Sequence, residues 1–158
     1  MFKKSIFIFS LMLFILFPIS SSAHDHSSVN VTPEHERKHA AKMGEQGPKK
    51  SQGIKSANQL GIVELSEEFP NIGNRIMRAR EIVIEPGGIV AVHEHQNRPG
   101  LAYILEGEII EHRNDHNEPL LRKAGDVAFE NSGVIHWWEN RSSKIVRALV
   151  VDIIEHKQ

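Results

Sequence analysis

Two histidines one residue apart, His93 and His95, are followed by a third, His136, much later in the chain. The residues before the first pair are rich in valine and isoleucine, which is typical of a β-strand. Because side chains alternate along a strand, we expect His93 and His95 on one face and Glu94 on the other. Borderline divalent metals favour imidazole ligands, so a third histidine from another strand would complete a three-nitrogen site.

The elements that must position these histidines are short apolar segments in the second half of the chain. We expect strands at residues 75–84, 89–95, 101–105, 108–113, 126–129, 135–139 and 144–154. Gly, Pro, Asn and Asp mark the breaks between them, and no long helical period interrupts them. Short strands at regular spacing predict an all-β domain over residues 59–158, built as an antiparallel sandwich or barrel.

Residues 1–23 have the layout of a secretory signal peptide. Lys3 and Lys4 precede an almost wholly apolar run, and small residues end the segment at Ala23. The apolar run is short for a membrane-spanning helix. We therefore expect an exported protein, periplasmic or secreted, without membrane association once the signal is cleaved.

The charge balance and the lack of cysteine narrow the function classes. The chain has 19 basic and 20 acidic residues, and cleavage of the leader would remove two lysines and leave a net charge of −3. No basic field of the kind that holds nucleic acid is visible. Without cysteine there is no disulfide, thiolate ligand or thiol nucleophile, so His, Asp or Glu must hold any metal.

Residues 24–58 are polar, and we expect them to form a mobile tail with one or two helical turns after Thr32. This segment contains His35-Glu36-Arg37-Lys38-His39, which matches the zinc-protease pattern H-E-x-x-H. A protease would need that helix buried so that a third ligand could meet the metal. The surrounding residues are charged or small, so we interpret the stretch as part of a solvated tail.

The same tail suggests an alternative function in metal capture. Cleavage after Ala23 would expose the terminus His24-Asp25-His26, and an amine with a histidine at position three chelates Cu(II) or Ni(II). Further histidines in the tail would assist. The candidate ligands of this second site are His24, His26, His35 and His39.

The glycines and histidines of the β-rich part form two spaced motifs. The first consists of Gly87, His93, His95 and Gly107, and the second of Gly125, Asn131, Gly133, His136 and Asn140. Together they resemble the two motifs of the cupin superfamily. The resemblance implies a small double-stranded β-helix, or jelly-roll barrel, with one divalent metal inside. Matched position by position, the metal ligands would be His93, His95 and His136.

The sequence departs from the family pattern at two positions. Asn131 stands where the family has proline, and asparagine also suits a turn. Gly100 stands where the family has a glutamate ligand, so one carboxylate is missing. Glu106 and Glu130 are the carboxylates that could replace it, and the sequence alone does not place either one in the pocket.

Two interpretations follow from that loss. In the first, three neutral imidazoles hold Fe, Mn, Zn, Ni or Cu with open positions, and the uncompensated charge favours a small anionic molecule. This arrangement resembles the three-histidine dioxygenases of the superfamily. In the second, the metal is lost, and the pocket serves a metal-free binding protein or an isomerase-like cupin. We favour the first interpretation because all three imidazoles remain.

Other residues are candidates for the ligand pocket. Trp138 shares a strand face with His136, Tyr103 could donate a hydrogen bond, and Arg98 lies close in sequence to the first motif. Arg78 and Arg80 share a face of one strand, and we expect that face to point outward as a solvated or dimer surface. The expected partners are a small-molecule ligand and, by resemblance to other cupins, a second copy in a homodimer.

Overall fold

The computed structural model describes residues 31–42 and 46–156. The elements are α1 (Glu34–Lys42), β1 (Gln52–Glu64), α2 (Leu65–Glu68), β2 (Arg75–Glu94), β3 (Gly100–Glu106), β4 (Glu108–Arg113), β5 (Leu120–Lys123), β6 (Val127–Glu130), β7 (Ile135–Glu139) and β8 (Val146–Glu155). The expected signal peptide and the candidates His24 and His26 lie outside the described residues. Within the described ranges, neither helix is long and apolar enough to cross a membrane.

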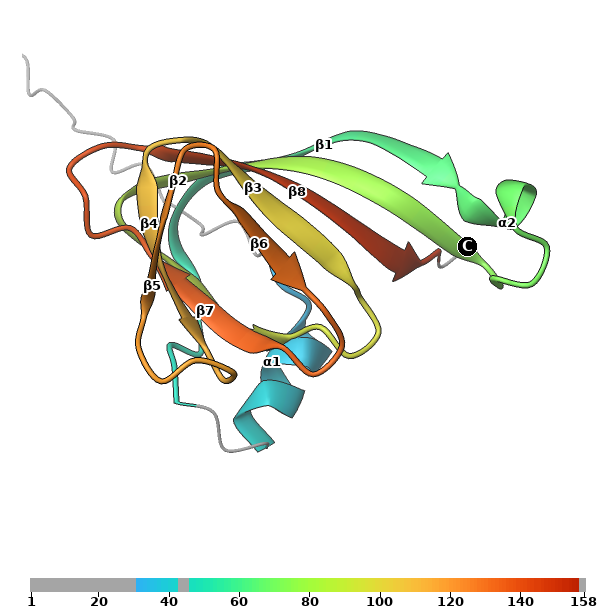
Figure 1. Ribbon diagram of the computed structural model, residues 1–158, viewed down its shortest axis with the longest axis horizontal. Helices are drawn as coiled ribbons and strands as arrows, with labels where there is room; N and C mark the ends of the chain where they lie inside the picture. Colours follow the sequence, from blue (N-terminus) through green and yellow to red (C-terminus); the bar gives the residue numbers. More distant parts are fainter. Residues whose placement is uncertain (1–30, 43–45, 157–158) are drawn as a thin grey trace, which may run out of the picture.

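The strands form one antiparallel sheet in the order β5-β4-β7-β2-β8-β3-β6, with β1 paired to β2. The sheet curls into a barrel, and β1, β2 and β8 run on to one side as a long arm that ends at α2 (Figure 1). The prediction of an all-β barrel is confirmed. The arm carries several exposed apolar side chains on β1, β2 and the α2 turn: Leu60, Ile62, Val63, Phe69 and Met77.

Strand β2 is a single bent strand of 20 residues where the sequence indicated two strands and a turn. Its first half, residues 75–84, pairs with β8, and its second half, residues 89–94, pairs with β7. The bend therefore carries the chain from one wall of the barrel to another. This arrangement places the histidine pair on the barrel wall next to β7.

The bend depends on glycine and on a buried amide. Gly87 has a φ of +74°, a conformation that side-chain-bearing residues rarely adopt. Asn140 is buried beside it, and its Nδ2 donates to the carbonyl oxygens of Ile84, Glu85 and Lys144 at 3.3, 3.0 and 2.8 Å. The glycine and the asparagine of the two motifs thus hold one corner of the barrel together.

The barrel interior is mostly apolar. Its buried residues include Ile82, Ile84, Val90, Ala102, Ile104, Ile109, Ala128, Trp138, Val146, Ala148 and Val150. They come from alternate positions of six strands, as expected for the inward faces of a closed sheet. The apolar side chains fill one part of the interior and leave the histidines at the other.

The segment before β1 differs from the mobile tail expected over residues 24–58. Val31 packs into the barrel core, and Ala40 of α1 packs with Val92 and Ile135 on the outside of the barrel. Strand β1 already begins at Gln52, inside the expected tail. The few apolar side chains of the segment contact residues distant in sequence, and local composition does not show such contacts.

Candidate metal centre

The three histidines meet inside the barrel. His93 on β2 is the direct cross-strand neighbour of His136 on β7, and His95 follows directly after β2. The Nε2 atom of His136 lies 2.9 Å from Nε2 of His95 and 3.1 Å from Nε2 of His93. All three residues are at most 4% exposed.

The other ring nitrogen of each histidine is held by an acceptor. Nδ1 of His93 lies 2.8 Å from the carbonyl oxygen of Ala91, and Nδ1 of His95 lies 2.9 Å from that of Arg98. A carbonyl can only accept, so each of these Nδ1 atoms carries the proton and donates it. Each neutral ring then has a bare lone pair on Nε2.

His136 is oriented in the same way by a carboxylate. Its Nδ1 lies 2.8 Å from Oε1 of Glu111, which is fully buried. Burial alone would raise the pKa of Glu111, but the hydrogen bond with His136 and the nearby charge of Arg113 hold that pKa below its usual value. An ionised Glu111 accepts a hydrogen bond from Nδ1 of His136 and so orients the ring with Nε2 toward the other two histidines.

Burial keeps the first histidine pair neutral. It lowers the pKa of His95 to about 2 and that of His93 well below 6.5, and the neighbouring His136 adds to both shifts. The neutral rings of His93 and His95 therefore direct two lone pairs toward Nε2 of His136. Without a proton or cation between them, nitrogens 2.9 Å and 3.1 Å apart repel each other.

This donor set fits a divalent transition metal. Zinc–nitrogen bonds are about 2.0–2.1 Å long, so two nitrogens on one ion lie roughly 3 Å apart. Within the described ranges, these three histidines are the one group of three or more His, Asp or Glu side chains with mutually close donor atoms. Their Nδ1 partners fix the tautomers that a metal requires.

The structure also places the two carboxylates that the sequence left open. Glu130 points into the barrel, with Oε1 3.7 Å from Nε2 of His136. Glu106 is largely exposed and lies 3.6 Å from Arg147 on the outside. Of these two candidates, Glu130 is therefore the one close to the histidines.

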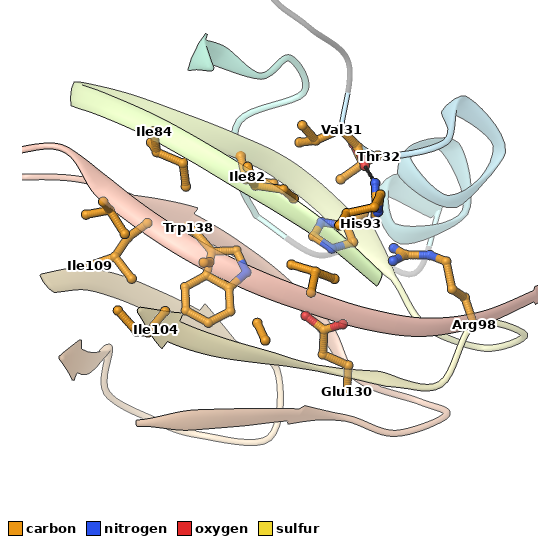
Figure 2. A pocket seen from close by; sticks show the side chains of 16 residues that line it. Val31, Thr32, Ile82, Ile84, His93, Arg98, Ile104, Ile109, Glu130 and Trp138 are labelled. Carbon is orange, nitrogen blue, oxygen red and sulfur yellow. Dashed lines mark hydrogen bonds between the residues drawn. The ribbon is translucent and has the colours of Figure 1, made fainter. Parts of the chain in front are cut away.

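A cavity of about 40 Å³ lies beside the centre. His93, Glu130, Arg98 and the segment Val31-Thr32 line its polar end, and isoleucines line the other end, with Trp138 between (Figure 2). Val31 and Thr32 close the cavity beside His93. A ligand in this cavity would meet the metal at one end and an apolar wall at the other.

The two tryptophans and the tyrosine take different positions. The ring centroids of Trp138 and His136 are 5.3 Å apart, edge to face, so Trp138 forms a wall of the centre. Trp137 points to the other side of β7 and stacks on His112 at 3.7 Å. Tyr103 is half-buried on β3 and does not line the cavity.

The prediction that Arg78 and Arg80 face outward is wrong. Both donate to the carboxylate of Asp152, which is fully buried, and Arg80 lines the cavity. Sequence alternation correctly indicates that the two arginines share a face. The buried acid that draws them inward lies on β8, more than 70 residues away in sequence.

Arg98 lines the cavity but is already paired. Its Nε and Nη2 donate to the two carboxylate oxygens of Glu36 on α1 at 2.8 and 2.7 Å, and its Nη1 donates to Asp152 at 3.2 Å. Glu36, the central glutamate of the H-E-x-x-H stretch, therefore attaches α1 to the barrel. His39 lies 2.9 Å from Glu94, and neither His35 nor His39 joins the histidine centre.

The fold is a small antiparallel β-barrel with three histidines buried together inside it. Residues 80–152 match the family model described as Cupin domain. Residues 80–152 therefore form a cupin domain, as the two motifs predict. The match covers β2 from Arg80 to most of β8, which includes all three histidines.

The comparisons add one curated relative and two solved structures. The chain is 38% identical over 71 residues to the Oxalate-binding protein of Thermotoga maritima, a match that covers 45% of this chain and 57% of the relative. The chain thus spans little more than half of that relative.

The structure of TT1209 from Thermus thermophilus has a TM-score of 0.51 at 23% identity, covering 73% of this chain and 94% of the other. The Cnp3 cupin domain of Schizosaccharomyces pombe has a TM-score of 0.51 at 17% identity, covering 65% and 62%. Both structures show the shared fold.

Proposed function

We propose that the protein holds one divalent transition metal through His93, His95 and His136 and binds a small carboxylate at that metal. The observation that carries this proposal is the convergence of three Nε2 atoms, each on a ring whose Nδ1 donates to a buried acceptor. A centre with three protein nitrogens leaves coordination positions open for a small ligand.

The charges around the centre favour an anion. His93 and His95 are neutral, and the three nearby arginines pair with two carboxylates, Asp152 and Glu36. A bound divalent cation would be the largest local charge and would attract a chelating anion strongly in a buried site. The small cavity and the name of the Thermotoga maritima relative support a compact dicarboxylate such as oxalate.

The experiment has two stages. Purified protein is analysed for bound metal beside His93→Ala and His136→Ala, with the exposed His116→Ala as the matched control. The wild type and His116→Ala should hold one metal per chain, and the other two variants should hold much less. Calorimetry with oxalate should then show binding to the metal-loaded protein, weaker binding of acetate, and no binding after chelator treatment. Equal metal content in all four proteins contradicts the proposal.

A dioxygenase-type reaction is a second proposal at the same centre. It is supported by the three-histidine donor set and the apolar cavity, because oxygen-activating iron sites also keep open positions. Anaerobic loading with Fe(II), followed by oxygen-uptake measurements with small carboxylates and enolisable acids, tests it. Isomerase-like turnover by metal-stripped protein would favour the metal-free alternative instead.

We also propose export to the periplasm or the medium, on the pattern of residues 1–23. Cell fractionation and N-terminal sequencing test it, and a mature terminus at His24 is the expected result. Copper binding that persists in His136→Ala and disappears when residues 24–30 are deleted would support metal capture by the terminal histidines.

A further inference from the structure

We propose that Glu130 is a fourth protein ligand of the metal and supplies from β6 the carboxylate that the family pattern places at position 100 on β3. This inference rests on the proposed three-histidine metal centre and adds to it. The carboxylate would have moved to the neighbouring strand, and the centre would remain a three-nitrogen, one-oxygen site.

The register between β3 and β6 places Glu130 beside position 100. Gly100 on β3 is the direct cross-strand neighbour of Glu130 on β6. Directly opposed residues of an antiparallel pair point to the same face of the sheet. The alternation along β6 agrees, since Phe129 is 62% exposed and Glu130 only 3% exposed. Glu130 therefore enters the interior from the position beside the missing glutamate.

Position 100 has no room for a side chain. A Cβ atom there would lie 2.5 Å from the carbonyl oxygen of Val151 and 3.1 Å from Cα of Asp152. Strand β8 approaches β3 so closely that only glycine fits. The neighbouring carboxylate on β8, Asp152, is held by three arginines and is not free to serve the metal. Glu130 is the remaining acid of this row.

The carboxylate of Glu130 lacks a partner of its own. Its Oε2 atom is buried and has no hydrogen-bond partner among the described residues. Leaving a buried polar group unsatisfied costs about 1–3 kcal/mol, and more for a charged group. A cation at the histidine centre would offset that cost. Glu130 also lines the same end of the cavity as His93 (Figure 2).

The distances allow a shared metal. Oε1 of Glu130 lies 3.7 Å from Nε2 of His136, and Oε2 lies 3.5 Å from Nδ1 of His95. Two ligands each about 2.0–2.2 Å from one zinc ion lie at most about 4 Å apart. A rotation of the side chain within the cavity is therefore enough to complete the contact. The competing role is an ion pair with Arg80, whose Nε is also buried and has no hydrogen-bond partner within the described ranges.

The test is the Zn²⁺ affinity of Glu130→Gln, measured by competition with a chelator, beside Glu106→Gln as the matched control. Since the loss of supporting partners around a metal site alone costs about 10–100-fold in affinity, the loss of a ligand should weaken binding at least 10-fold. The control should bind like the wild type. The visible absorption spectrum of the Co²⁺-loaded protein should change in Glu130→Gln and stay unchanged in Glu106→Gln.

A second variant separates ligation from packing. Glu130→His keeps a donor atom at the position, so it should retain more of the affinity than Glu130→Gln and shift the Co²⁺ spectrum. Equal affinities and identical Co²⁺ spectra in the wild type and Glu130→Gln would overturn the inference and favour the pair with Arg80. If the wild type itself binds neither Zn²⁺ nor Co²⁺, the proposed three-histidine centre fails and this inference fails with it.

Discussion

Two buried acids flank Gly100, and their surroundings are opposite. Asp152 on β8 and Glu130 on β6 are both direct cross-strand neighbours of Gly100, so the three residues form one row across the sheet. Asp152 lies among three arginines and accepts four hydrogen bonds: two from Arg78 at 3.0 and 2.8 Å, one from Arg80 at 3.0 Å and one from Arg98 at 3.2 Å. Glu130 lies beside the three histidines, and its Oε2 has no hydrogen-bond partner in the part of the chain that the structure describes.

The difference separates a structural charge from a functional one. Four hydrogen bonds, each of 3.2 Å or less, satisfy both oxygens of Asp152 from protein groups alone. Burial would raise the pKa of Asp152, but the hydrogen bond from Arg78 and the charges of Arg80 and Arg98 hold it below its usual value. Burial raises the pKa of Glu130, and the weaker effects of His136 and Arg98 do not reverse that shift. The fold thus satisfies both oxygens of Asp152 and leaves Oε2 of Glu130 without a hydrogen-bond partner among the described residues, which agrees with the proposed ligand role of Glu130.

The largest expected effect comes from neutralising the satisfied acid. Asp152→Asn removes the carboxylate that pairs with all three arginines in a buried site and leaves the pair of Glu36 with Arg98 in place. Breaking a buried ion pair from one side costs about 3–5 kcal/mol, so we expect a loss of that order in the free energy of unfolding. Urea unfolding followed by circular dichroism measures it.

The matched control is Asp115→Asn. Asp115 also pairs with an arginine, at 2.8 Å from Arg113, but its side chain is 46% exposed. Exposed ion pairs contribute about 0–1 kcal/mol, so this variant should unfold close to the wild type. Equal losses in the free energy of unfolding of the two variants would show that the buried pairs of Asp152 stabilise the fold no more than an exposed pair does.

The second largest effect is expected from low pH, which should weaken the pairing of Asp152 with the three arginines. Because the folded-state pKa of Asp152 lies below its unfolded value of 3.8, its contribution is fully present above pH 3.8 and is lost as the pH falls through the folded-state pKa. The free energy of unfolding should therefore fall below about pH 4 in the wild type. The fall should be shallower in Asp152→Asn. Parallel curves would assign the acid sensitivity to other carboxylates, such as Glu111.

The contrast between the two acids also shows which parts of the site the sequence could predict. The spacing of His93, His95 and His136 depends on local strand alternation and on motif distances, so the sequence predicts the three ligand candidates together. The position of Glu130 depends on the register between β3 and β6, which are separated by β4 and β5 in the chain. No local pattern determines that register. Alternation along β6 does place Glu130 on the same face as Ala128 and opposite to Phe129, so a strand model with Ala128 inward would also turn Glu130 inward.

The same reasoning explains why the structure differs from the sequence-based expectation at the arginine cluster and at the segment before β1. Arg78 and Arg80 alternate with apolar residues, and the strand has two faces that both carry isoleucine, valine or arginine. Only the buried Asp152 decides which face is inward. The docking of α1 likewise depends on Glu36 and Arg98, which are 62 residues apart in sequence. Both features are tertiary charge pairings that local periodicity does not show.

Neutralising Glu130 should not lower the free energy of unfolding, in contrast to neutralising Asp152. In metal-free protein, Glu130→Gln removes a buried carboxylate without a hydrogen-bond partner at Oε2. Leaving such a group unsatisfied costs about 1–3 kcal/mol, and the buried amide of glutamine would still carry part of that cost. We therefore expect the variant to be as stable as the wild type or about 1 kcal/mol more stable. The measurement is urea unfolding in the presence of a chelator. A loss comparable to that of Asp152→Asn would mean that Glu130 is a structural acid after all.

The smallest effect is expected where α1 meets the barrel through an exposed pair. His39 lies 2.9 Å from Glu94, with its side chain 50% exposed, whereas the pair of Glu36 with Arg98 is buried. Exposed pairs contribute about 0–1 kcal/mol, so His39→Ala should change the free energy of unfolding by less than that and leave metal content unchanged. Glu36→Gln should instead increase hydrogen exchange across α1, because it removes a buried charge partner of Arg98. Faster exchange in His39→Ala than in Glu36→Gln would reverse the ranking of the two contacts.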